Sequence, residues 1–477
     1  MAATAPHLPE RELCFNGTGV VDEIHHPGGD GNEVSTSVAA LTEGVIQTMM
    51  IMKQLPVPLL LCCLLSAFAH AEDADKAVAG REPQLELSEP VTVALAPPEV
   101  KAWGPYQFPG LARLSNGTIQ LSYHVEADSA KAYGLPPARA VSADDGRTWK
   151  LLPREKADNR AAVAWQSPPL RLPNGDLIGA RQERPLKTED LKLPAQPIGH
   201  FVNYGHRMDW YRVEDLSPEC ADGWILSRQP AKATQSTDER AKVRLPGELR
   251  HVTEGVMPRP WLQTLFLAPD SAVWAVQYDN RLVNGTLKKH FWPMILRSTD
   301  AGRTFDLWSE IPYAPDAKAD PKAADRIGFT EPTVCFMADD SVLCLMRTTD
   351  GRGPGPSYLS RSTDNGKSWS PPAVFDDLGV WPQMLRLKNG VTLASYGRPG
   401  LYVRATADPA GLSWAKRVTV VPPGAISTET CSYSALLPLG DNRALLAYSD
   451  FNLRDAEGKL CKGMRVREIR VMGSNAK

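Results

Sequence analysis

Pairs of short apolar runs, each pair joined by a tight turn, recur along the chain after residue 100. The first run reads as a buried strand and the second ends in a polar residue, which is the pattern of a β-hairpin. Six such units are found. They are FPGLARLSNGTIQLSYH (108–124), SPPLRLPNGDLIGAR (167–181), PWLQTLFLAPDSAVWAVQYD (260–279), EPTVCFMADDSVLCLMR (331–347), WPQMLRLKNGVTLASYGR (381–398) and YSALLPLGDNRALLAYSD (433–450).

Three of the turns contain Asn-Gly, at residues 116–117, 174–175 and 389–390. Both residues tolerate positive φ, so the dipeptide predicts two-residue hairpin turns. The segments 85–95 and 464–472 also read as strands, and we expect one of them to complete the last sheet and so remove an open edge.

A second pattern, S-x-D-x-G-x-[TS]-[WF], follows several of the hairpins. It occupies residues 142–149, 298–305 and 362–369, with a degenerate copy at 405–414. The Asp carboxylate can accept backbone N–H bonds from its own turn, the Gly permits a left-handed conformation, and the aromatic ring can pack under the turn. Each segment therefore predicts a stabilised hairpin.

These repeats resemble the Asp-box of the sialidase (neuraminidase) superfamily. The resemblance covers nearly all of residues 100–450 and implies an all-β chain folded as a six-bladed β-propeller with Asp-box hairpins. Each box would join the two outer strands of a blade, and the boxes themselves would be structural. The longest insertion lies between Arg181 and Thr253, where no clear box is found.

The N-terminal part of the chain contains a targeting segment at residues 49–71. Lys53, an apolar stretch over 55–69 and the sequence Ala69-His70-Ala71 match a signal peptide, and the apolar stretch is too short for a membrane span. We therefore expect a secreted or periplasmic protein with its propeller in residues 72–477. Residues 1–48 are interpreted as a mis-assigned start or a long leader.

Composition narrows the function classes. The formal net charge is -2. The chain therefore lacks the basic surplus that would indicate a nucleic-acid partner, and we expect no membrane insertion after signal cleavage. No cysteine that remains after signal cleavage has metal-ligand spacing, and the glycosidase mechanism implied by the resemblance needs neither a metal nor an organic cofactor. Cys335 and Cys344 flank a turn and are expected directly opposite each other, either as a disulfide or as two buried thiols.

Candidate chemistry lies at the ends of the hairpin strands. Because the two ends of a hairpin lie opposite its turn, polar residues there should converge at one mouth of the molecule. The polar residues at these positions are Gln107, Asp128, Arg181, Glu254, Asp279, Glu331, Arg347, Arg398 and Tyr433.

The resemblance implies roles for several of these residues. Tyr433 resembles the nucleophilic tyrosine, Glu331 its glutamate partner, and Asp128 the acid/base aspartate. Arg347 and Arg398 resemble two arginines of a carboxylate-binding triad. Gln107, in Tyr-Gln-Phe-Pro, stands where the family has its first arginine, and losing that charge-assisted bond costs about 1.5–3 kcal/mol.

Another basic residue can take the place of the missing arginine; Arg139, Arg181 and Arg259 are the candidates. The predicted function is a retaining exo-glycosidase that releases a terminal sialic acid or related anionic sugar from a glycan or sialoglycoconjugate. Two alternatives are an exo-glycosidase for a different sugar and a non-catalytic carbohydrate-binding propeller. Trp103, Trp165 and Trp381 suit sugar stacking, although packing within the blades explains them better.

Overall fold

The computed structural model describes residues 82–156, 162–163, 168–221, 223–349, 355–425 and 428–472. The predicted signal peptide and the residues before it lie outside this range. The described residues form β-strands and short 3-10 helices, so the predicted all-β class is confirmed. The 3-10 helices are η2 (Ala130–Ala132), η3 (Thr188–Asp190), η4 (Val213–Asp215), η5 (Pro218–Cys220) and η6 (Ala323–Asp325).

Three of the sheets have four or five strands and are formed by the two ends of the described chain and by residues 107–240. Sheet A contains β1 (Gln84–Leu87), β2 (Val91–Leu95), β30 (Ser434–Pro438), β31 (Arg443–Arg454) and β32 (Leu460–Met472). Sheet B contains β3 (Gln107–Arg113), β4 (Ile119–His124), β5 (Ala138–Ser142) and β6 (Lys150–Leu151). Sheet C contains β7 (Ala162–Val163), β8 (Leu170–Arg171), β9 (Leu177–Gln182), β13 (Ile225–Gln229) and β14 (Thr237–Arg240).

Three further sheets of the same size follow along the chain. Sheet F contains β15 (Lys242–Arg244), β18 (Thr264–Leu267), β19 (Val273–Val283), β20 (Thr286–Ser298) and β21 (Thr304–Glu310). Sheet G contains β22 (Phe329–Phe336), β23 (Val342–Thr348), β24 (Ser357–Ser362) and β25 (Ala373–Asp376). Sheet H contains β26 (Val380–Arg386), β27 (Thr392–Gly397), β28 (Leu401–Thr406) and β29 (Val418–Val421).

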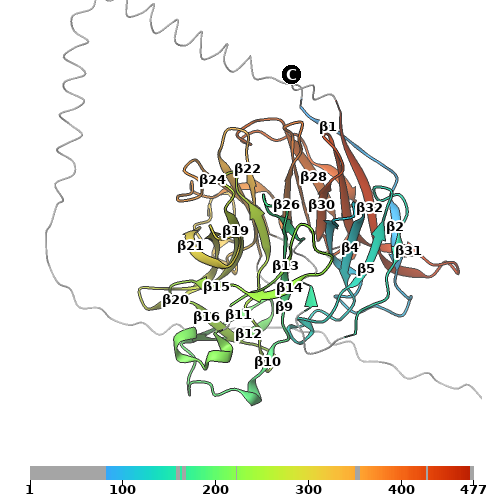
Figure 1. Cartoon of the computed structure of the whole chain (residues 1–477). Coiled ribbons are helices and arrows are strands. Elements are labelled where there is room, and N and C mark those ends of the chain that lie inside the picture. The colour runs from blue at the N-terminus through green and yellow to red at the C-terminus, as the bar shows by residue number, and fades with distance from the viewer. Residues whose placement is uncertain are drawn as a thin grey trace, which may run out of the picture. The chain divides into compact units, whose positions relative to one another are not determined.

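The long insertion forms two small sheets of its own. Sheet D pairs β10 (Leu186–Lys187) with β17 (Val256–Met257), and sheet E contains β11 (Gly199–Asn203), β12 (His206–Arg212) and β16 (Leu249–Val252). Figure 1 shows these green strands together at the lower end of the drawing. The insertion also supplies β15, which lies parallel to β21 at the edge of sheet F.

The six expected strand pairs form, but the three Asn-Gly turns are longer by one residue than the predicted two-residue turns. At the first Asn-Gly, Leu114 N donates to Thr118 O over 2.8 Å, which leaves three residues in the loop. Gly117 has a φ of 85°, whereas Asn116 does not have positive φ. This is a turn that ends in one left-handed residue, an arrangement that Asn-Gly satisfies as well as it satisfies a two-residue turn.

The same loop length corrects the expectation for the two cysteines. Asp340 takes the left-handed position (φ 63°) in the turn between β22 and β23, and the register places Cys335 opposite Leu343 and Cys344 opposite Val334. A shift of one residue puts the two side chains on opposite faces of sheet G. Both cysteines are buried free thiols.

The S-x-D-x-G-x-[TS]-[WF] segments are here termed the Asp turns. They join the two outer strands of sheets B and G, and in sheet F they join β20 to β21, beyond which β15 forms the edge. In the first of them Asp144 Oδ1 accepts bonds from Ser142 Oγ at 2.8 Å and Thr148 N at 2.9 Å. Trp149 Nε1 donates to Gly146 O at 2.9 Å. Hydrogen bonds from Thr148 and Ser142 lower the pKa of Asp144 to about 2, because they favour the ionised form.

Buried apolar clusters and loop contacts join neighbouring large sheets of the described chain. Buried apolar clusters join A with B, C with F, F with G, G with H, and H with A. Loops of sheets B and C meet where Arg184 Nη1 donates to Tyr133 O at 2.7 Å. Sheets A, F, G and H therefore each share buried apolar clusters with two neighbours, and sheets B and C each share one with a single neighbour.

Sheet A combines both ends of the described chain. The N-terminal strands β1 and β2 both pair antiparallel with the C-terminal strand β32, and Figure 1 shows the blue strands beside the red ones. Both terminal segments thus join the last sheet, where one was expected.

Candidate active site

The first strands of sheets B, G and H share a local distortion. Phe108, Glu331 and Trp381 each precede a proline and have φ values of 57°, 49° and 46°. Pairing with the second strand shifts at each of these points, as in a β-bulge, which redirects a side chain. All three residues line one cavity of about 370 Å³, a size typical of small-molecule sites.

Glu331 stands at the centre of a hydrogen-bonded group at this cavity. Its Oε1 accepts bonds from Tyr433 Oη at 2.5 Å and from Arg347 Nη1 at 2.7 Å. Its Oε2 accepts a bond from Trp381 N at 2.9 Å. The side chains of Glu331 and Arg347 are each only 3% exposed, so the ion pair is held in a fixed position.

Tyr433 is a neutral phenol beside a base. Burial raises its pKa well above the ordinary value, and the negative charge of Glu331 acts in the same direction, while Arg347 and Arg398 oppose both. Arg347 Nη1 lies 3.5 Å from Tyr433 Oη. The phenol therefore needs an acceptor for its proton before it can act as a nucleophile, and Glu331 Oε1 is in hydrogen-bond contact with it.

Aromatic rings fix the orientation of Tyr433. Trp381 stacks on it, with ring centroids 4.8 Å apart and an interplanar angle of 19°, and Phe108 packs edge-on at 4.7 Å. The guanidinium of Arg398 lies 5.9 Å from the Tyr433 ring centroid and 5.2 Å from that of Trp103. Arg398 Nη2 also donates to Cys431 O at 2.6 Å.

Asp128 lines the same cavity, from the loop that follows β4. Its surroundings raise the pKa of its carboxyl group through burial and through the nearby charge of Glu254, against a hydrogen bond from the Trp103 side chain. A raised pKa keeps a carboxyl group protonated to higher pH, as a general acid requires.

A further carboxyl group, Asp279 of β19, also lines the cavity. Burial raises its pKa to about 7, although the Asn280 backbone and the charges of Arg250 and Arg281 oppose this. The charged groups that act on Asp279 differ from those that act on Tyr433.

Four predicted residues lie outside the cavity lining. Gln107 is fully buried, and neither amide atom has a hydrogen-bond partner in the described part of the chain. Arg181 is directed away and lies 3.3 Å from Asp238, while the next residue of β9, Gln182, lines the cavity. Arg347 and Arg398 lie behind Tyr433. Of the three tryptophans, Trp381 lines the cavity, Trp103 packs behind it, and Trp165 lies outside the described residues.

The predicted substitutes for the missing arginine differ in whether they line the cavity. Arg259 lines the cavity and donates to Glu219 O. Arg139 pairs with Glu155 at 2.5 Å, outside the lining. The sequence marks Glu254 and Asp279 as residues at strand ends, but it gives neither a role.

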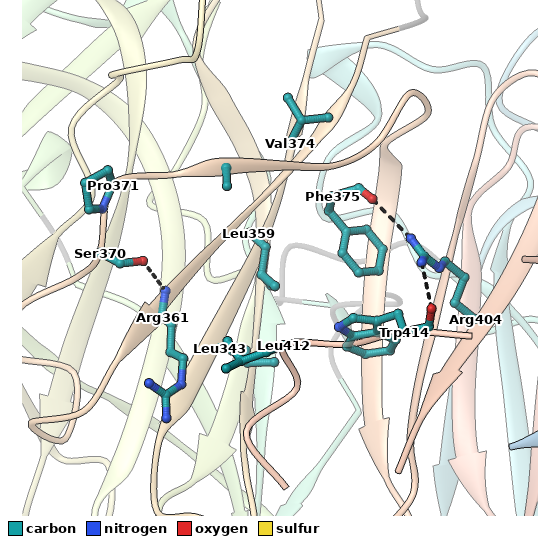
Figure 2. A pocket seen from close by; sticks show the side chains of 11 residues that line it. Leu343, Leu359, Arg361, Ser370, Pro371, Val374, Phe375, Arg404, Leu412 and Trp414 are labelled. Carbon is teal, nitrogen blue, oxygen red and sulfur yellow. Dashed lines mark hydrogen bonds between the residues drawn. The ribbon is translucent and has the colours of Figure 1, made fainter. Parts of the chain in front are cut away.

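A second hollow, of about 320 Å³, lies between the outer strands of sheets G and H. Figure 2 shows Phe375 and Trp414 facing each other there, with Arg404 bonded to the backbone of both. Its two charged lining residues, Arg361 and Arg404, are both engaged. The hollow is a seam between two sheets, and its lining contains no carboxylate, histidine, cysteine or tyrosine side chain.

The described ranges contain neither a candidate metal site nor a candidate membrane-spanning helix. No group of three or more His, Cys, Asp or Glu side chains is arranged to hold a metal ion. No helix there has the length and apolar character needed to cross a membrane.

No protein-family model matches the chain, and no curated protein matches it. Among solved structures it is similar to a protein of unknown function from Dyadobacter fermentans, with a TM-score of 0.57 and 17% identity over 81% of this chain and 99% of that one. This score indicates a shared fold.

Two glycosidase structures resemble the chain less closely. One is the GH93 α-L-arabinofuranosidase of Fusarium graminearum in complex with arabinobiose, with a TM-score of 0.47 and 15% identity over 81% of this chain and 99% of that one. The other is Trypanosoma rangeli sialidase in complex with the inhibitor DANA, with a TM-score of 0.41 and 12% identity over 78% of this chain and 56% of that one. At these scores the likeness carries no conclusion about activity.

Proposed function

We propose that the chain is an exported six-bladed, sialidase-like β-propeller that acts as a retaining exo-glycosidase on a terminal sialic acid or a related anionic sugar. The observation that carries the proposal is the 2.5 Å contact between Tyr433 Oη and Glu331 Oε1, at a cavity that Asp128 also lines. A nucleophile paired with its base, opposite a carboxyl group of raised pKa, is the arrangement that double displacement requires.

In the first step, Tyr433 Oη attacks the anomeric carbon and its proton passes to Glu331 Oε1. Asp128 gives its proton to the leaving oxygen, so the glycosidic bond breaks as the tyrosyl–sugar bond forms. Glu331 is held for this task by Arg347 and the Trp381 N–H. These contacts leave its Oε1 directed at the phenol.

In the second step, water attacks the same carbon and Asp128, now ionised, accepts its proton. The Tyr433–sugar bond breaks and the phenolate recovers its proton from Glu331. The two inversions give net retention. A neutral phenol suits an anomeric carbon that bears a carboxylate, because it avoids repulsion between like charges.

A second candidate substrate is a neutral terminal sugar. It is favoured by one observation: Gln107, Arg347 and Arg398 are buried and none of them lines the cavity, so the expected clamp offers little polar surface to an anionic sugar. The non-catalytic alternative would gain from a Glu331 carboxyl group far from the Tyr433 hydroxyl, whereas the two groups are in hydrogen-bond contact.

The test is release of a fluorescent aglycone from a panel of sialosides, other sugar acids and neutral glycosides, by the wild type and by Tyr433→Phe. We expect hydrolysis of an anionic member by the wild type and a loss of at least about 100-fold in Tyr433→Phe. Cleavage of neutral glycosides alone would favour the second candidate. Equal rates for the two proteins would exclude Tyr433 as nucleophile.

A further inference from the structure

Glu254 occupies a backbone position that glutamate rarely takes. It forms a two-residue turn with Gly255, and the flanking Thr253 and Val256 exchange two hydrogen bonds of 2.9 Å. The φ values are 51° at Glu254 and 75° at Gly255, as in a type I′ turn, whose first position favours Asn, Asp or Gly. Strain of this kind concentrates at functional sites.

The carboxylate of Glu254 holds the loop that carries Asp128. Its Oε2 accepts bonds from Ser129 Oγ at 2.7 Å and from Ala130 N at 2.9 Å. Its Oε1 lies 3.3 Å from His206 Nδ1. Ser129 follows Asp128 directly, and both carboxyl groups line the cavity. Glu254 thus connects the long insertion to the loop after β4.

We propose that Glu254 is a positioning residue for Asp128: through Ser129 and Ala130 it anchors the loop that presents the Asp128 carboxyl group at the cavity for proton transfer to the leaving oxygen. This inference rests on the proposed function, because it assigns Glu254 a part in the acid step of that reaction.

The charged groups around Asp128 set the direction of the expected effect. Glu254 raises the pKa of Asp128, in addition to the larger effect of burial, whereas the Trp103 hydrogen bond and the charges of His206 and Arg398 lower it. Tyr133, a further titratable neighbour, is itself affected by the charge of Asp128. Removing the charge of Glu254 therefore lowers the pKa of Asp128 and shifts loss of the acid form to lower pH.

The experiment compares two glycosides of the sugar that the wild type cleaves. One has an alkyl leaving group, which must be protonated, and the other has a dinitrophenyl leaving group, which leaves without a proton. Glu254→Ala removes both the anchor and the charge. Glu254→Gln keeps an oxygen that can accept the Ser129 and Ala130 bonds and removes only the charge. Glu214→Gln, at an exposed ion pair with Arg212, is the control for a change in net charge.

We expect Glu254→Ala to lower kcat/KM at least about 10-fold for the alkyl glycoside and less than about 3-fold for the dinitrophenyl glycoside. In Glu254→Gln, the alkaline limb of the pH profile for the alkyl glycoside should move to lower pH, and in Glu214→Gln it should stay in place.

Equal losses on both glycosides, or an unchanged alkaline limb in Glu254→Gln, would overturn the role of Glu254 while leaving the glycosidase intact. A wild type that cleaves neither glycoside, or a Tyr433→Phe variant as active as the wild type, overturns the proposed function instead.

Discussion

Replacement of Glu331 by Gln tests the buried pair and the chemistry together. The change keeps the shape of the side chain and removes its charge. Arg347, whose side chain is only 3% exposed, is then left without a counter-ion. Breaking one partner of a buried ion pair costs about 3–5 kcal/mol. The base for Tyr433 is lost as well, which lowers kcat by about 10²–10⁴-fold.

A double-mutant cycle separates the two effects. We expect Arg347→Met to destabilise by a similar amount, since it leaves Glu331 unpaired. The double variant Glu331→Gln/Arg347→Met should recover most of the stability but none of the activity, because the buried charges are gone and so is the base. The free energy of unfolding is measured in urea by tryptophan fluorescence. The value of kcat is measured with the aryl glycoside that the wild type cleaves. The reasoning would be refuted if the destabilisations of the two single variants added up to that of the double variant within about 0.5 kcal/mol. A fully active Glu331→Gln variant would refute it as well.

Three predictions concern the rest of the molecule. The folded-state pKa of Asp144 is about 2, below the unfolded value, so its contribution to stability is present above about pH 4 and is lost as the pH falls toward 2. Urea midpoints over this range should show a weaker acid dependence in Asp144→Asn. The pKa of Asp279 is about 7, above the unfolded value, so stability falls as the pH rises from about 4 to 7. Asp279→Asn should therefore be more stable than the wild type at pH 8, by more than about 1 kcal/mol, and not at pH 4. A Cβ on Gly366 would meet Trp274 at 2.3 Å, whereas one on Gly390 would meet nothing within 4 Å, at φ of 75° and 86°. In urea unfolding, Gly390→Ala should lower the free energy of unfolding by about 1–2 kcal/mol through backbone strain. Gly366→Ala should lower it by about 1–3 kcal/mol more, because the added Cβ overpacks the core.

Local patterns were sufficient to predict the strand pairs, because each hairpin and Asp turn is specified by adjacent residues. The length of the turns was not predictable in the same way. Asn-Gly fits a two-residue turn and also a three-residue loop that ends in a left-handed Gly, and only the pairing of Leu114 with Thr118 distinguishes them. The error in the placement of Cys335 and Cys344 follows from this ambiguity.

The group of Tyr433, Glu331 and Arg347 follows from the rule that hairpin ends share one side of the molecule. That rule does not specify which of two adjacent residues faces the cavity. Side chains alternate along a strand, so a step of one residue exchanges Arg181 for Gln182. At Gln107 the bulge has the corresponding effect, because it directs Phe108 into the cavity.

The contacts of Glu254 had no signal in the sequence. Its partners Ser129 and Ala130 lie about 125 positions away, and the long insertion has no repeat from which its path could be inferred. The positive φ at Glu254 is likewise visible only in the structure.

The most direct test of the account is to trap the covalent intermediate. A fluorinated glycosyl fluoride of the sugar that the enzyme cleaves slows the second step, and peptide mass spectrometry then locates the attached sugar. We predict one sugar on the peptide that contains Tyr433, and none on Tyr433→Phe. A sugar attached to Asp128, Glu254 or Asp279, in an enzyme that turns over the parent glycoside, would contradict the assignment of Tyr433 as the nucleophile.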